Sequence, residues 1–265
     1  MGRATDVINR SRKIVLKVGS NALTTDSGFL NEEIIQSLAD QIVALRKAGK
    51  QIIVVSSGAE ISGLTALGIK NRRGDINYKQ AMCSIGQVEL MMAYKKCFTA
   101  DGVHIGQLLL TRRDFEEASA AMHIRNCLFT LLDEGVVPII NENDSVSIEE
   151  FGFGDNDALA ALTANLWNAD LLVLMSNVDG VFDRAPADGV QATLIREVTS
   201  IAALEAAVDT QGKSSFGTGG MESKISAAKT VGAYGTPMLL VNGKCKGILL
   251  DIAGGSDACT IFEEE

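Results

Sequence analysis

Histidine and cysteine, which carry much nucleophilic and zinc chemistry, are scarce or badly spaced in this chain. The 265 residues include two histidines, His104 and His123, and neither an HExxH nor a GxSxG motif. Zinc-protease and serine-hydrolase mechanisms are therefore not indicated. The five cysteines are scattered and never form a CxxC pair, which argues against a zinc site and is typical of a reducing compartment. We therefore expect a cytoplasmic protein.

Long apolar runs and basic clusters are also missing. No segment approaches the roughly 18 consecutive apolar residues of a membrane span, and the N-terminus lacks the apolar core of a signal peptide. Lysine and arginine total 24 against 33 acidic residues, a net charge of -9. Nucleic-acid binding requires a basic surface. The sequence therefore predicts partners that are neither membranes nor nucleic acids.

The usual nucleotide fingerprints are absent or misplaced. The sequence has no GxGxxG motif, and its loose Walker A match at residues 207–214 follows a helical pattern instead of a strand. A nucleotide site would have to be built from other turns.

Apolar residues are abundant, at 46% of the chain, and they form short runs that alternate with helical patterns. Strands are predicted at 13–18, 51–55, 104–110, 136–140, 171–175, 238–241 and 259–262. One helix is predicted to begin at 31 and a second, after the strand at 51–55, to end at 67. Further helices are predicted at 78–98, 121–133, 158–167, 201–208 and 217–233. This alternation predicts an α/β fold with a mostly parallel sheet covered by helices on both faces. We expect a single domain over 1–265, with lobes at 1–170 and 171–265.

The most unusual segment is 141–157, NENDSVSIEEFGFGDND, which holds six carboxylates and no lysine or arginine. It follows the apolar run 136–140, and open α/β sheets bind ligands at the carboxyl ends of their strands. A positive charge should meet this segment: a substrate ammonium, a divalent cation, or lysines from elsewhere in the chain. Within it, 145–154 has the pattern of a β-hairpin.

Three turns have the glycine and serine content of phosphate-binding loops, because glycine lets backbone N–H groups approach oxygen atoms closely. They are Gly19-Ser20, Ser57-Gly58 and the GTGG turn at 217–220, which precedes a helical pattern with Lys224 in its first turn. Such turns are also common without a ligand. Lys17 stands inside an apolar strand, where lysine is costly unless its ammonium reaches an anion.

Phosphoryl transfer to a carboxylate would account for these residues. A carboxylate acceptor is already ionised at neutral pH, so no histidine or other general base is required. Lysines, backbone N–H groups and Mg²⁺ suffice to position the phosphates and neutralise their charge.

Six segments resemble the amino-acid kinase family: KVGSNAL at 17–23, VVSSGA at 54–59, GQLLLTRRD at 106–114, PIINEND at 138–144, GDND at 154–157 and GTGGMESK at 217–224. The pairing of INEND with GDND is similar to the members that phosphorylate the γ-carboxylate of L-glutamate, the first step of proline biosynthesis. The resemblance implies a three-layer αβα sandwich, with L-glutamate on the N-terminal lobe and ATP with Mg²⁺ on the C-terminal lobe. It also implies a homo-oligomer, dimer or tetramer, and L-proline as a candidate feedback inhibitor.

The resemblance also implies a role for each matching residue. Lys17 and Lys224 would contact the transferring phosphoryl group, and Asp157 would hold the two ammonium groups in place. The residues expected to bind glutamate are Ser57, Gly58, Asp144 and Asn156, with Asp144 facing the α-ammonium. The residues expected to bind ATP are Lys17, Gly19, Ser176, Asn177, Thr218, Gly219, Gly220, Met221, Glu222, Ser223 and Lys224. No protein ligand of Mg²⁺ is implied.

The chain departs from the family pattern at two points, and two alternatives stay open. Ser176-Asn177 stands where members usually have Thr-Asp, and we do not expect the C-terminal PUA domain of many bacterial members. One alternative is a kinase of the same fold that acts on acetylglutamate or aspartate. The other is a non-catalytic nucleotide-binding regulator. N-acetylation removes the charge that Asp144 should meet, so a substrate panel would separate glutamate from acetylglutamate.

Overall fold

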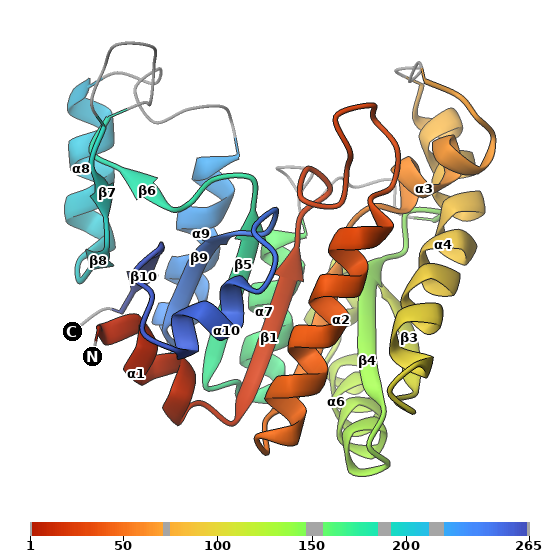
Figure 1. Ribbon diagram of the computed structural model, residues 1–265, viewed down its shortest axis with the longest axis horizontal. Coiled ribbons are helices and arrows are strands. Elements are labelled where there is room, and N and C mark those ends of the chain that lie inside the picture. Colours follow the sequence, from red (N-terminus) through yellow and green to blue (C-terminus); the bar gives the residue numbers. More distant parts are fainter. Residues whose placement is uncertain (1, 71–74, 147–155, 185–191, 212–219, 264–265) are drawn as a thin grey trace.

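The computed structural model describes residues 2–70, 75–146, 156–184, 192–211 and 220–263. Within them, helices cover both faces of an eight-stranded sheet (Figure 1). The strands are β1 (Lys13–Val18), β2 (Gln51–Ser56), β3 (Ile105–Leu110), β4 (Val137–Glu142), β5 (Leu171–Ser176), β6 (Val181–Phe182), β7 (Leu194–Ile195), β8 (Glu197–Val198), β9 (Met238–Asn242) and β10 (Cys259–Phe262). The helices are α1 (Arg3–Arg10), α2 (Glu32–Lys47), α3 (Ala59–Ala66), α4 (Ile76–Thr99), α5 (Arg112–Glu116), α6 (Ala118–Asp133), α7 (Asp157–Trp167), α8 (Ile201–Gln211), α9 (Met221–Gly232) and α10 (Ile248–Ala253).

The strand order of the large sheet is β3-β4-β2-β1-β5-β9-β10-β8. Pairing is parallel from β3 through β9, whereas β10 runs antiparallel to β9. β1 lies near the middle of the sheet. The next three strands in the chain, β2, β3 and β4, lie on one side of it, and β5 lies on its other side. This reversal creates a topological switch point at the carboxyl ends of β1 and β5, where α/β sheets bind ligands. The predicted mostly parallel sheet is confirmed.

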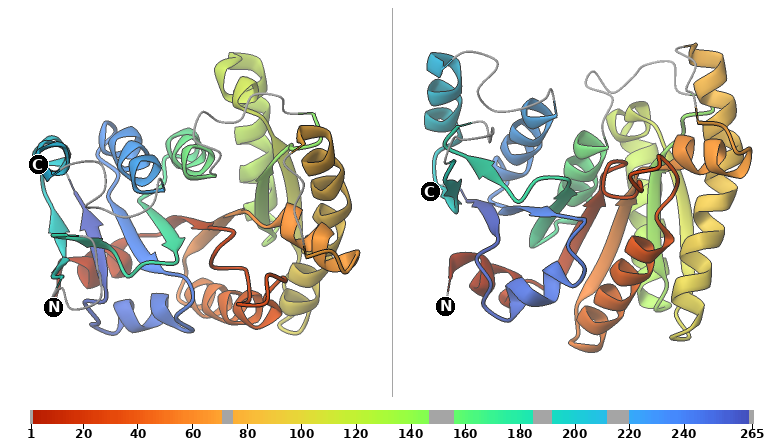
Figure 2. Two further views of the ribbon diagram at one scale, coloured as in Figure 1. Left: turned by 90° about the horizontal axis from the view of Figure 1, so that it is seen from above. Right: turned by 45° about the horizontal axis from the view of Figure 1, so that its top comes forward.

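Alternate residues of each central strand face two different apolar cores. Ile14 and Leu16 of β1 pack with α1, α2, α4 and α10, whereas Val15 packs on the opposite face with α6, α7, α8 and α9. Figure 2 shows these two helical layers on either side of the sheet. Because side chains alternate along a strand, Lys17 points to the same face as Val15, toward α7 and α9.

Two glycines allow α3 and α4 to pack backbone to backbone. A Cβ atom at Gly63 would collide with the carbonyl of Met82, and one at Gly86 would collide with the carbonyl of Ala59. Any side chain at either position would push the helices apart. The close approach fixes α4 beside the carboxyl ends of β2 and β4, where several polar side chains gather.

The structure adds short elements that the sequence analysis did not predict. They are α1, α5 and α10 and the two-residue strands β6, β7 and β8. The hairpin expected at 145–154 falls almost wholly outside the described residues. Among the helices described, none combines the length and apolar character needed to cross a membrane.

Candidate active site

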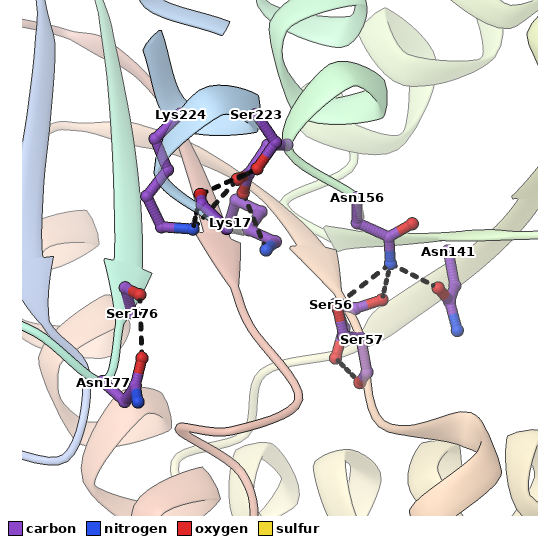
Figure 3. Close-up of polar contacts among 11 residues, drawn as sticks. Lys17, Ser56, Ser57, Asn141, Asn156, Ser176, Asn177, Ser223 and Lys224 are labelled. Carbon is purple, nitrogen blue, oxygen red and sulfur yellow. Dashed lines mark hydrogen bonds and ion pairs between the residues drawn. The ribbon is translucent and has the colours of Figure 1, made fainter. Parts of the chain in front are cut away.

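Two lysines and one aspartate form a buried ionic cluster at the carboxyl end of β1 (Figure 3). Lys17 Nζ lies 2.7 Å from Asp157 Oδ1, and Lys224 Nζ lies 3.3 Å from Asp157 Oδ2. Ser223 Oγ donates a hydrogen bond of 2.8 Å to the same Oδ2 atom. Only 3% of Lys17 is exposed, and Asp157 is fully buried. The expected pairing of Asp157 with both lysines is therefore present in the structure.

Asp157 stays ionised although it is buried. Burial alone would raise the pKa of its carboxyl, but attraction by Lys17 and Lys224 and hydrogen bonds from Lys17 and Ser223 outweigh that effect and lower the pKa. Asp157 is also the first residue of α7, so the positive end of the helix dipole favours its negative charge. Two ammonium groups thus share the carboxylate of Asp157.

Glycine backbone lies against both ammonium groups. A Cβ atom at Gly19 would stand 3.4 Å from Lys17 Nζ, and one at Gly220 would stand 3.5 Å from Lys224 Nζ. The Gly220 carbonyl also accepts a hydrogen bond of 2.9 Å from Lys224 Nζ. A side chain at either glycine would therefore stand in contact with an ammonium group.

A second polar group, the amide cluster, lies at the carboxyl ends of β2 and β4. Its members are Ser56, Ser57, Asn141 and Asn156. Asn156 Nδ2 donates to the Ser56 carbonyl at 2.9 Å, to Ser57 Oγ at 3.2 Å and to Asn141 Oδ1 at 2.8 Å. Figure 3 shows the side-chain oxygen of Asn156 directed away from these partners. The structure thus brings together Ser57 and Asn156, both predicted to bind the acceptor.

Asn156 and Asp157 connect the two groups because they are consecutive residues. Asn156 faces the amide cluster, and Asp157 faces the lysines. The sheet order places β5, β1, β2 and β4 side by side, so the ionic cluster at β1 adjoins the amide cluster at β2 and β4. Gly58 follows Ser57 of the amide cluster and is the N-cap of α3. Its φ of 101° is a conformation that strongly favours glycine.

Asp144 lies beyond β4 and faces α4. Burial and repulsion by Glu60 raise the pKa of its carboxyl, while attraction by Lys79 and a hydrogen bond with Cys83 act in the opposite direction. The carboxylate would therefore gain from a further positive charge, such as the ammonium of an amino acid.

The residues expected to bind the nucleotide are only partly described. Ser176 ends β5, and its Oγ donates a 3.4 Å hydrogen bond to Asn177 Oδ1. Met221 packs against the core, and Glu222 is exposed. Thr218 and Gly219 lie outside the described residues. Nucleotide contacts at all these positions stay a prediction.

Three side chains on one face of α4 were missed by the sequence analysis. Cys83 contacts Asp144, Gln87 accepts a 2.8 Å hydrogen bond from Asn141, and Tyr94 shares a 2.9 Å hydrogen bond with Ser56. They are four and seven residues apart, a helical spacing that would have been visible in the sequence. Nothing in the sequence, however, indicated that this face of the helix meets the polar strand ends.

The described residues contain no preassembled metal site. No group of three or more histidine, cysteine, aspartate or glutamate side chains there could hold a metal ion.

Two solved structures share the fold. The structure of UMP kinase from Ureaplasma parvum matches 96% of this chain and 100% of its own, with a TM-score of 0.66 and 19% identity. Carbamate kinase from Giardia lamblia, bound to AMP-PNP, matches 97% of this chain and 100% of its own, with a TM-score of 0.65 and 13% identity. The expected three-layer αβα architecture is confirmed.

Sequence relatives extend over nearly the whole chain. Glutamate 5-kinase of Alkaliphilus metalliredigens is 52% identical over 258 residues, which is 97% of this chain and 98% of the relative. Glutamate 5-kinase of Alkaliphilus oremlandii is 49% identical, over 98% of this chain and 99% of the relative. Glutamate 5-kinase of Geobacter metallireducens is 43% identical, over 97% of this chain and 69% of the relative. The model of the amino acid kinase family matches residues 12–242, and this chain belongs to that family.

Proposed function

We propose that this protein is a glutamate 5-kinase, which transfers the γ-phosphoryl group of ATP to the γ-carboxylate of L-glutamate. The products are L-glutamyl 5-phosphate and ADP, and the reaction is the first step of proline biosynthesis. The observation that carries the proposal is the adjacency of Asn156 and Asp157. One residue faces a neutral amide cluster that suits an amino acid, and the next holds two buried lysines that suit a phosphoryl group.

The reaction requires positioning and charge neutralisation more than acid–base chemistry. An oxygen of the γ-carboxylate attacks the γ-phosphorus, and the bond from that phosphorus to the oxygen bridging to the β-phosphate breaks. The carboxylate is ionised at neutral pH, so no proton has to be removed from it. Both reactants are anions, and the ammonium groups of Lys17 and Lys224 would offset their repulsion and the charge of the transition state.

The acceptor would lie over the carboxyl ends of β2 and β4. Ser57, Gly58 and Asn156 would bind the amino acid, and Asp144 would pair with its α-ammonium. The raised pKa of Asp144 supports this role, because an arriving positive charge would relieve the cost of burying the carboxylate. An N-acetylated or shorter acceptor would make poorer use of these groups.

The nucleotide would bind across the carboxyl end of β5 and the start of α9. Gly19, Ser176, Asn177 and the 218–224 segment would contact it. Mg²⁺ would supply charge neutralisation on the phosphates, and it would be held mainly by phosphate oxygens because the described residues offer no preassembled acidic site. A cytoplasmic location, an oligomeric state of two or four chains and inhibition by L-proline stay predictions.

Acyl-phosphate formation tests the proposal directly. The protein would be incubated with ATP and Mg²⁺, and the product trapped as a hydroxamate, with L-glutamate, N-acetyl-L-glutamate and L-aspartate compared in parallel. We expect turnover with L-glutamate and little with the other two. Turnover with another acceptor alone would overturn the substrate, and ATP binding without any hydroxamate would indicate a regulatory protein.

A further inference from the structure

Gln87, in the middle of α4, lies behind the amide cluster. Its Oε1 accepts a 2.8 Å hydrogen bond from Asn141 Nδ2. Asn141 Oδ1 in turn accepts 2.8 Å from Asn156 Nδ2 and 2.9 Å from the Glu142 backbone N–H. Gln87 is therefore two hydrogen bonds away from the predicted acceptor-binding residue Asn156.

Two backbone groups, one at Asn156 and one at Asn141, fix the orientation of every amide in this series. The Ser56 carbonyl can only accept, so the atom of Asn156 that faces it must be Nδ2. The Glu142 N–H can only donate, so the atom of Asn141 that faces it must be Oδ1. Asn141 Nδ2 therefore donates to Gln87, and the accepting atom of Gln87 must be Oε1. This assignment leaves the Gln87 Nε2 group as a donor.

No acceptor for that donor lies within the described residues. Gln87 Nε2 is buried, and within the described structure it has no hydrogen-bond partner. A buried donor without a partner is costly, and each such group in a native structure calls for an explanation, such as a functional role or a bound water or ion. One turn earlier on the same face of α4, Cys83 contacts Asp144. Gln87 therefore contacts the amides predicted to hold the amino acid, and it shares a face of α4 with the residue that contacts Asp144, the group predicted to meet an α-ammonium.

We propose that Gln87 binds and positions the acceptor amino acid. Its Oε1 holds Asn141 and, through it, Asn156, while its Nε2 donates a hydrogen bond to the α-carboxylate of the acceptor. We assign this hydrogen bond to the α-carboxylate because that group adjoins the α-ammonium. The γ-carboxylate must instead face Lys17 and Lys224. This inference rests on the proposed function, since it names a further residue of the same acceptor site.

Two substitutions separate the roles of the two amide atoms. Gln87→Glu keeps an acceptor for Asn141 but removes the donor and places a negative charge near the α-carboxylate. Gln87→Met keeps the length of the side chain and removes both polar functions. Gln36→Met, at an exposed position of α2, is the matched control. The readouts are kcat, the KM values for L-glutamate and ATP, and the thermal midpoint with and without L-glutamate.

We expect both Gln87 variants to raise the KM for L-glutamate at least tenfold, to leave the KM for ATP within twofold, and to lose the thermal shift caused by L-glutamate. The control should match the wild type. A KM for L-glutamate within twofold of the wild type in Gln87→Glu would overturn the donor role, and the same result in Gln87→Met would overturn the inference entirely.

Failure of the proposed function would look different from failure of this inference. If the wild type used L-aspartate or N-acetyl-L-glutamate instead, the substrate would be wrong, and the Gln87 variants would be tested with that acceptor, which also has an α-carboxylate. A wild type that neither reacts with nor is stabilised by any of the three acceptors would overturn both.

Discussion

Asp157 is the residue on which the arrangement of both lysines depends. Replacing it with asparagine keeps the shape but leaves two buried ammonium groups without their carboxylate. Removing one partner of a buried ion pair costs roughly 3–5 kcal/mol, so we expect Asp157→Asn to lower the free energy of unfolding by that order. Because both lysines lose their fixed positions, kcat should fall by on the order of 100-fold.

Kinetics and unfolding experiments check this prediction together, with Asp40→Asn on the exposed face of α2 as control. Assays at a temperature well below the thermal midpoint of the variant separate lost catalysis from lost folding. An unchanged kcat would contradict the assigned role of Asp157.

The same carboxylate has a consequence for acid stability. The pKa of Asp157 is lowered from 3.8 to about 2 in the folded protein. A lowered pKa contributes stability that is fully present above the unfolded value and is lost as the pH falls through the folded value. We expect the wild type to lose this contribution between about pH 4 and pH 2. Asp157→Asn should show a flatter dependence of unfolding free energy on pH over that range.

Protonation of Asp144 should cause the fall in kcat/KM for L-glutamate at low pH, the acid limb of the pH profile. Its pKa is raised by burial, so it becomes neutral at a higher pH than an ordinary aspartate does. The neutral form cannot pair with an α-ammonium, and kcat/KM for L-glutamate should fall as the pH drops through this raised pKa. Asp144→Asn should raise the KM for L-glutamate by about 10- to 100-fold and remove this limb of the profile. A limb that persists in the variant would assign the titration to another group.

At the scale of elements, the packing of α3 on α4 determines where the back of the acceptor site lies. A methyl group at Gly86 would collide with the Ala59 carbonyl. Overpacking of this kind typically costs about 1–3 kcal/mol, and a displaced α4 would also move Gln87 away from Asn141. We expect Gly86→Ala to lower the thermal midpoint and to raise the KM for L-glutamate more than the KM for ATP. Glu89→Ala, exposed on the same helix, should change neither.

The central strands and long helices could be predicted from the sequence because their apolar patterns are strong. Helix α1 could not, since it has only eight residues and depends on distant partners. Lys50 Nζ donates to the carbonyls of Ile8, Asn9 and Ser11 at its C-terminal end, and Arg3 pairs with Glu263. A pattern read within one segment cannot show such contacts.

The candidate site was also predictable in part, but from family resemblance instead of apolar patterns. Lys17, Asp157 and Lys224 belong to segments that resemble a known family, and the structure brings them together. Gln87 lies in a long helix with no such segment, and its contact with Asn141 follows only from the packing of α4 beside β4. Residues that act through the orientation of a neighbour are invisible until the fold is known.

At the scale of the whole molecule, the two expected lobes share one sheet. β5, the first strand of the expected C-terminal lobe, pairs with β1 along five residues. The Asp170 carboxylate accepts hydrogen bonds of 2.8 Å from the backbone N–H groups of both Arg12 and Lys13. Each apolar core also draws residues from both sides of position 170. Opening the molecule at that position would expose β1 and both cores at once.

We therefore expect residues 1–265 to unfold as one cooperative unit. Calorimetry should give a single transition, in which the calorimetric enthalpy equals the van't Hoff enthalpy. Residues 1–170 expressed alone would carry β1 as an open edge with an apolar face on each side, and should show no cooperative melting and bind a hydrophobic dye. Two resolved transitions, or cooperative melting of the 1–170 fragment, would instead show that the lobes fold independently, with glutamate and nucleotide sites on separately stable parts.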